Sequence, residues 1–421
     1  GDVYFIRSDN SNYGRIRIRS DDRIEFIVVL SNSTLINKRS NKLLRDCSGW
    51  YHIVLAIDLT LSTEEDKIKL YINNERITSW LSNTNTSATS GDWVGGDGNW
   101  NPNIGGGYGV GAFFDGSMSF VSFVDGQALT PSTFGETDSD TGQWKIKTDI
   151  VPGGTGWGTN GYLILKNGNS LTDESTNTNN FQVLAGGTLT NTLDCPDNVF
   201  ATMNSLDNFW STSTYANGNN TVTSANNGYT YSTSTFGVAT GKWYWEIKWS
   251  AQPTGSSDQV QIGIARRPAP SSTTWLGQQL YTYGYQGSSG HVQNNNVNAS
   301  GSVATPYSVG DIISVAMDLD NNKIHFAKNG AWTNSSDPAA NSGGVTITAP
   351  DSTPEDSGFY FAAFGDSNVS LQETGQFNFG NGFFGTSAVA DNSTATASTP
   401  GTFNYDVPAG YQPLSTKGLN A

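Results

Sequence analysis

The sequence predicts an all-β fold built from two β-sandwich, jelly-roll domains, and two observations carry that prediction. Gly, Asn, Ser and Thr dominate the 421 residues, and long runs of the helix-favouring Ala, Leu, Glu and Lys are missing. Several short segments alternate apolar and polar residues and end at turn residues, a pattern typical of strands. Because 36% of the residues are hydrophobic and 12% are aromatic, the chain can fill two or three domain cores.

Charge narrows the range of partners. The net charge of -15 and the pI near 4.5 argue against nucleic acid or an anionic membrane as the main partner. Basic residues nevertheless concentrate near the N-terminus, where Arg15, Arg17 and Arg19 alternate with Ile16 and Ile18. This alternation predicts the solvated face of a strand, and the alternative is an interface with a negatively charged neighbour.

The two cysteines, Cys47 and Cys195, are too few for a disulfide framework and have no metal-ligand spacing. We expect both to be small buried apolar residues. No apolar run approaches the roughly 20 residues that cross a bilayer, so we expect no membrane insertion.

The first predicted domain covers residues 1–150. Residues 24–30, 50–58 and 67–72 are strand-like, and residues 114–129 follow as a fourth segment. This order resembles the laminin-G or concanavalin A-like jelly roll. The strands that open that fold are missing here, so we expect a sheet that is incomplete or is completed by another chain.

Residues 80–112 are rich in Gly, Asn, Ser and Thr and predict a long loop. Its Trp93 and Trp100 are candidates for stacking on a sugar or for a subunit contact, and the alternative is that they anchor the loop to its own sandwich. The laminin-G resemblance also implies a possible calcium site, although that ion needs about six to eight converging oxygens. The candidate ligands are Asp92, Asp97 and Asp115.

Residues 151–206 predict an irregular connecting region, with short strand-like pieces between Gly, Thr and Asn runs. Within it, residues 163–165 are a candidate edge strand of the first sandwich.

The second predicted domain covers residues 207–415 and contains the clearest hairpin in the chain. An apolar run over residues 312–319 is followed by the turn at residues 320–322 and by the alternating Ile324 and Phe326.

Four further segments surround this hairpin in the order 241–249, 260–265, 358–366 and 376–380. The whole order resembles the SPRY family, whose β-sandwiches bind partners and carry no catalytic groups. The succession of a jelly roll, a linker and a SPRY unit resembles structural proteins of tailed bacteriophages. Residues 416–421 remain as a short tail.

No catalytic constellation is visible in the sequence. Jelly-roll glycosidases need two carboxylates facing the same side of a sugar, and the aromatic strand at residues 241–249 offers only Glu246. The acidic cluster at residues 64–66 lies in a predicted turn. Nucleophile elbows, phosphate loops and paired cysteines are absent. We therefore expect that the chain is not an enzyme and needs no cofactor, with calcium as the open exception.

Candidate ligand contacts in the second domain are aromatic residues and one histidine in polar loops. His52 and His325 lie in predicted strands, where packing or a hydrogen bond explains them best. The alternative for the tyrosine row is that rings at alternate positions pack into the sandwich. The candidates are Trp275, Tyr281, Tyr283, Tyr285 and His291.

The resemblance implies a virion structural protein at the extracellular surface of the particle: a fibre, a tail appendage or a capsid decoration. The expected partners are other virion subunits and a host-surface glycan, and a homotrimer is expected because fibres usually are trimers. One alternative is a purely architectural subunit that joins fibre or shell components. A second is a polysaccharide-degrading enzyme on a jelly-roll fold.

Overall fold

The computed structural model confirms the all-β prediction. It divides into two compact units, Gly1–Leu189 and Thr190–Ala421. In the part of the chain that the structure describes, helix is limited to α1 (Glu64–Lys67), α2 (Thr416–Leu419) and three short 3-10 turns. The described residues are 1–47, 49–85, 101–107, 112–139, 142–166, 170–184, 189–207, 210, 213–226, 228–252, 259–299, 301–302, 304–351, 357–368, 372–390 and 400–419.

The first unit is built on a six-stranded antiparallel sheet with the strand order β8-β4-β3-β2-β1-β9. Two of its strands correct the predicted long loop at residues 80–112, because β8 and β9 form the two edges of the sheet. These strands are rich in polar residues such as Asn and Thr, so they lack the apolar alternation that predicts a strand. The strands are β1 (Asp2–Asp9), β2 (Asn12–Ile18), β3 (Arg23–Leu30), β4 (Ser33–Leu43), β8 (Trp80–Asn85) and β9 (Asn101–Ile104).

The arginines in β2 and just after it are not simply solvated. Arg17 Nε donates to Glu25 Oε2 at 2.6 Å, and Arg19 Nη1 lies 3.1 Å from Glu25 Oε1. Arg39 on β4 pairs with Asp21. The side chains of Arg17 and Arg19 keep 25% and 30% of their surface exposed. The predicted charged face is therefore a network of half-buried ion pairs within the sheet.

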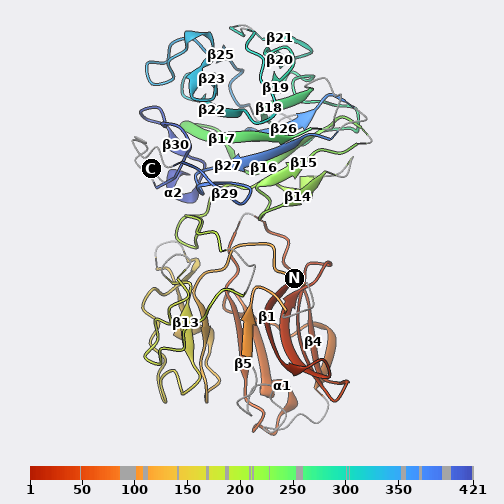
Figure 1. Cartoon of the computed structure of the whole chain (residues 1–421), viewed down its shortest axis with the longest axis vertical. Helices are drawn as coiled ribbons and strands as arrows, with labels where there is room; N and C mark the ends of the chain where they lie inside the picture. Colours follow the sequence, from red (N-terminus) through yellow and green to blue (C-terminus); the bar gives the residue numbers. More distant parts are fainter. Residues whose placement is uncertain are drawn as a thin grey trace. The chain divides into compact units, whose positions relative to one another are not determined.

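The first unit has three layers, and a three-stranded sheet forms the middle one. Leu55 and Ile57 of this sheet pack toward the six-stranded sheet, whereas Val54 packs with Trp157 and Leu163 of a third layer of short strands. Figure 1 shows β4, β5 and β13 in these successive layers. The middle sheet contains β5 (Ile53–Ile57), β6 (Ile68–Ile72) and β7 (Glu75–Arg76), and the third layer contains β10 (Val121–Phe123), β11 (Gly135–Thr137), β12 (Trp144–Ile146) and β13 (Tyr162–Ile164).

The predicted connecting region does not form a unit of its own. Residues 151–189 belong to the first unit and residues 190–206 to the second. The candidate edge strand at residues 163–165 corresponds to β13, which pairs with β10 rather than with the six-stranded sheet.

The second unit is a sandwich of a nine-stranded sheet and a six-stranded sheet. The predicted central hairpin is β22 and β23, with Val315 opposite Phe326. Its closing turn follows β23, where Asn329 and Gly330 adopt the positive φ angles that such a turn requires. The nine-stranded sheet contains β14 (Thr214–Ala216), β15 (Thr221–Thr223), β17 (Lys242–Ala251), β22 (Ile312–Asp318), β23 (Lys323–Lys328), β24 (Ala331–Trp332), β25 (Val345–Thr346), β27 (Thr374–Asn378) and β30 (Gln412–Pro413).

The other sheet has the order β16-β26-β18-β19-β20-β21. Between the two sheets lies a large aromatic and aliphatic core that includes Trp245, Trp249 and Phe364. Trp243, Trp245 and Trp249 share one strand face, as the sequence predicted. The strands of this sheet are β16 (Tyr231–Val238), β18 (Val260–Ala265), β19 (Thr282–Gln286), β20 (Val292–Asn294), β21 (Val297–Asn298) and β26 (Tyr360–Asp366), and a separate hairpin joins β28 (Phe383–Phe384) to β29 (Ser387–Ala388).

The two ends of the second unit are bonded to each other. The backbone N–H of Ala201 donates to the carbonyl of Leu414 at 2.8 Å, and that of Thr416 donates to Val199 at 2.9 Å. We name this pairing of residues 198–201 with 414–417 the clasp. Figure 1 shows β30, which leads into this segment, beside its partner strand β17.

Candidate functional site

The candidate site of the second unit is carried by the loop at residues 266–281. This loop packs on the outer face of β18, β19 and β26, where Ala265 and Ala363 are buried together with Leu276 of the loop. Small residues make this approach possible, since a Cβ atom on Gly284 would lie 2.4 Å from the carbonyl oxygen of Leu276. The loop is therefore held flat on a rigid sheet.

Arg267 and Tyr281 form the polar part of the site. The guanidinium carbon of Arg267 lies 4.2 Å from the centre of the Tyr281 ring, and Nη2 of Arg267 donates a hydrogen bond to the Tyr281 hydroxyl. Tyr231 Oη in turn donates to the backbone carbonyl of Arg267 at 3.2 Å. These contacts fix a half-buried aromatic ring and a cation next to each other at the surface.

Two exposed apolar side chains belong to this loop and to the hairpin that is bonded to it. Leu280 is 60% exposed and Val297 is 62% exposed. The turn before β21 is attached to the loop, because Asn294 Nδ2 donates to the Leu280 carbonyl at 2.9 Å. We name Arg267, Leu280, Tyr281 and Val297 the loop patch.

Two of the predicted tyrosine contacts lie in the core. Tyr283 is 3% exposed and Tyr285 is 1% exposed, and both rings belong to the cluster between the sheets. The Tyr285 hydroxyl donates to the carbonyl of Thr305, and burial raises the pKa of that hydroxyl above its ordinary value. Neither ring offers a face to a ligand. Tyr281 and Trp275, in contrast, are half-buried residues of the loop.

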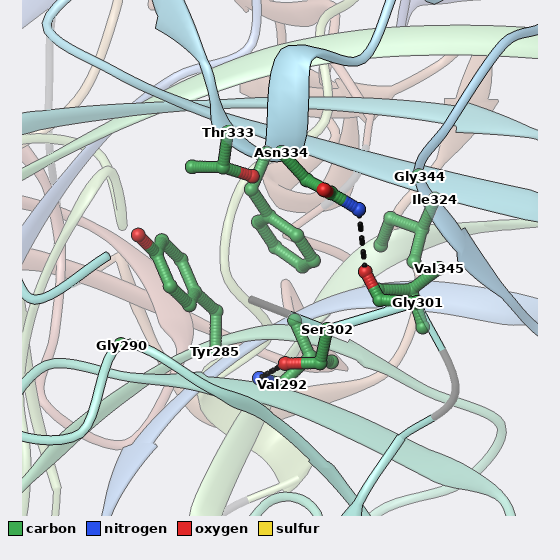
Figure 2. Close-up of a pocket in the computed structure, with 11 residues that line it drawn as sticks. Tyr285, Gly290, Val292, Gly301, Ser302, Ile324, Thr333, Asn334, Gly344 and Val345 are labelled. Carbon is green, nitrogen blue, oxygen red and sulfur yellow. Dashed lines mark hydrogen bonds between the residues drawn. The ribbon is translucent and has the colours of Figure 1, made fainter. Parts of the chain in front are cut away.

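His291 lies next to a small cavity at one end of the sandwich. Its Nδ1 is 3.3 Å from Ser302 Oγ, which also accepts a 2.6 Å bond from the Val292 N–H. Figure 2 shows Ser302 and Tyr285 on opposite sides of the cavity, with the bond from Asn334 Nδ2 to Gly301 closing one wall. The cavity of about 10 Å³ has room for one water molecule and not for a sugar.

Four of the predicted site residues, Trp93, Trp100, Asp92 and Asp97, lie outside the described residues. The remaining calcium candidate, Asp115, is exposed. Among the residues whose placement is described, no three His, Cys, Asp or Glu side chains are grouped so that they could hold a metal ion. Calcium binding therefore stays a prediction.

Two of the buried carboxylates of the second unit, Glu246 and Asp366, have strongly raised pKa values. Burial raises the pKa of Glu246 to about 7, while the N–H groups of Asn404 and Tyr405 and the Tyr244 hydroxyl all donate to this carboxylate and favour its ionised form. Burial also raises the pKa of Asp366 to about 7. Sugar cleavage needs two carboxylates on either side of an accessible bond, and neither of these side chains is accessible.

Other polar residues singled out from the sequence have structural roles. The acidic cluster at residues 64–66 begins α1, where Glu64 pairs with Lys67. His52 Nδ1 accepts a 2.9 Å hydrogen bond from Trp144 Nε1. The half-buried Cys47 and Cys195 are not joined in a disulfide.

Sequence reasoning missed Arg267 and Leu280. One signal was available, because Arg266 and Arg267 are the only arginines after residue 76. They have different roles: Arg266 is 6% exposed with its guanidinium 5.0 Å from the Tyr360 ring centre, whereas Arg267 holds the surface ring of Tyr281.

A comparison with known protein families agrees with the β-sandwich fold of the second unit. The family model of the SPRY domain matches residues 242–382. This range begins with β17, ends just before β28 and includes the loop patch. SPRY domains are typically non-catalytic protein-interaction modules, and the second unit has the β-sandwich that this family predicts.

The crystal structure of the SPRY domain of human HERC1 is similar at 16% sequence identity, covering 37% of this chain and 86% of that chain with a TM-score of 0.29. That score is too low to support any finer comparison. No curated protein sequence matches the chain. No described helix is long and apolar enough to cross a membrane.

Proposed function

We propose that this chain is a non-catalytic virion structural protein of a tailed phage that recognises a host-surface glycan. In this proposal the first unit is a laminin-G-like sandwich, and the second unit makes the glycan contact through the loop patch. The observation that carries the proposal is the ring of Tyr281, held at the surface by Arg267 on a loop that is itself fixed to a rigid sheet.

The chemistry of the loop patch suits a carbohydrate. The flat face of a sugar ring stacks on an aromatic side chain, and guanidinium groups donate hydrogen bonds to hydroxyl or carboxylate oxygens. Trp275 in the same loop is a second half-buried aromatic residue. Because Arg267 already orients Tyr281, binding would cost little side-chain ordering.

Glycan-array binding by the purified chain tests the proposal. Tyr281→Ala should abolish binding, and Tyr13→Ala is a matched control because Tyr13 is also half-buried and also lies beside an arginine, Arg15, at 5.4 Å. Equal binding by Tyr281→Ala and the unmodified chain would contradict the assignment of the site. An unmodified chain that binds no glycan would contradict the proposed partner.

A second candidate is an architectural role in which the loop patch joins virion subunits, as a trimer or with another chain. Exposed apolar side chains favour it, since Leu280 and Val297 serve a protein contact better than a sugar contact. Light scattering after size exclusion would reveal a self-associated chain. Leu280→Ser should then release monomers.

A further inference from the structure

Lys38 of β4 is a buried amine without a charged partner. Its residue surface is 4% exposed, and among the described residues no carboxylate forms an ion pair with it. Nζ of Lys38 instead donates to Oδ1 of Asn83 at 2.5 Å. Burying an ammonium group without an ion-pair partner is costly, so burial weakens the protonation of this amine. Burial accordingly lowers the pKa of Lys38, against the opposing charges of Glu64 and Glu65.

The two side chains meet because of the strand register. Lys38 lies opposite Phe26 of β3 on one side and opposite Asn83 of β8 on the other. Directly opposed residues project from the same face of a sheet, and Phe26 places this face toward the core. The Lys38 amine also lies 5.5 Å from the centre of the Trp80 ring. The fold therefore holds the buried amine of Lys38 against the amide carbonyl of an exposed residue on the edge strand.

We propose that Lys38 and Asn83 become joined by an intramolecular isopeptide bond. The neutral Nζ attacks the amide carbon Cγ of Asn83, and a new Nζ–Cγ bond forms. The bond from Cγ to Nδ2 then breaks, and the displaced nitrogen leaves as ammonia with one proton from the attacking amine. One amine and one primary amide thus give one secondary amide and ammonia, with no oxidant, reductant or other reactant.

Three features favour this reaction over an ordinary hydrogen bond. Desolvated lysine amines are the nucleophilic form of this side chain. The fold already holds the amine and the amide in contact, so little further entropy is lost when they react. Asn83 is exposed on the edge strand, so ammonia can leave to solvent.

The bond would fasten the edge strand β8 to β4 across 45 positions of the chain. This proposed cross-link does not depend on what the loop patch binds.

Intact mass measured on the denatured full chain tests the proposal. The expected mass is below that calculated from the sequence by one ammonia molecule. Lys38→Arg and Asn83→Ala should both restore the calculated mass. Lys42→Arg is the matched control, because Lys42 lies on the same strand but pairs with Glu75, and it should keep the deficit. Protease digestion of the unmodified chain should yield one branched peptide that contains both residues, a result that does not depend on whether a variant folds.

An unmodified chain at its full calculated mass would overturn the proposal. A deficit that persists in Lys38→Arg would also overturn it, because the ammonia would then come from elsewhere, such as cyclisation at an Asn-Gly pair.

Discussion

The backbone N–H of Tyr405 donates a 2.8 Å hydrogen bond to Oε1 of Glu246, across 159 positions of the sequence. Oε2 of the same carboxylate accepts a 2.8 Å bond from the N–H of Asn404. Glu246 lies on the central strand β17 and is fully buried. One carboxylate therefore ties the C-terminal segment to the nine-stranded sheet.

Glu246→Gln should destabilise the second unit by about 3 kcal/mol, since the amide turns an NH₂ group toward buried donors and leaves them unsatisfied. Urea unfolding followed by tryptophan fluorescence measures the change. Asp351→Asn, at an exposed position of the same unit, should change stability by less than about 0.5 kcal/mol. Equal losses in the two variants would refute the role of Glu246.

A chain that ends at residue 399 should lose the cooperative unfolding of its second unit. The removed segment buries Phe403, Val407, Tyr411 and Leu414 and supplies both N–H donors to Glu246. Near-ultraviolet circular dichroism reports the packing of the tryptophans in this unit. A truncated chain with an unchanged spectrum and midpoint would show that the segment is dispensable.

His325 should make the second unit less stable in acid. Burial lowers the pKa of this 1% exposed imidazole from 6.5 to about 4, and the nearby charge of Lys323 acts in the same direction. The unfolded chain therefore binds the proton more tightly, so the contribution is present above pH 6.5 and is lost as the pH falls toward 4. The linked change is about 3 kcal/mol.

Urea midpoints across this pH range measure the effect. His325→Leu keeps a side chain of similar volume and should flatten the decline relative to the unmodified chain. Parallel curves for the two proteins would mean that another group is responsible.

The tyrosine row offers a test that separates packing from recognition. Tyr283→Ala should cost about 3–5 kcal/mol, because it removes a large ring from the core. Tyr281→Ala should cost about 1 kcal/mol or less, because its ring is half-buried at the surface. Thermal unfolding measures the loss of stability of both variants. Similar losses would mean that the Tyr281 ring also packs in the core.

Much of the fold could be predicted from the sequence wherever apolar alternation was strong. The hairpin of β22 and β23 appears with the expected turn, because runs such as residues 312–319 permit little else. The edge strands β8 and β9 could not be found in this way. Polar edge strands bury few side chains, so their pairing is decided by the neighbouring strand and not by their own residues.

The site was harder to predict because its three evenly spaced tyrosines lie in different environments. Tyr281, Tyr283 and Tyr285 look equivalent in the sequence, yet β19 begins at Thr282. Tyr283 and Tyr285 face the core, whereas Tyr281 precedes the strand and is turned toward Arg267.

The clasp has a consequence for engineering. Because residues 198–201 and 414–417 are hydrogen-bonded neighbours, the chain enters and leaves the second unit at one place. A short linker could connect these ends directly, and new termini could then be opened at the exposed turn after Asp320. The resulting circular permutant would keep every strand pairing of the sandwich and could be transplanted as a cassette into a surface loop of an unrelated scaffold.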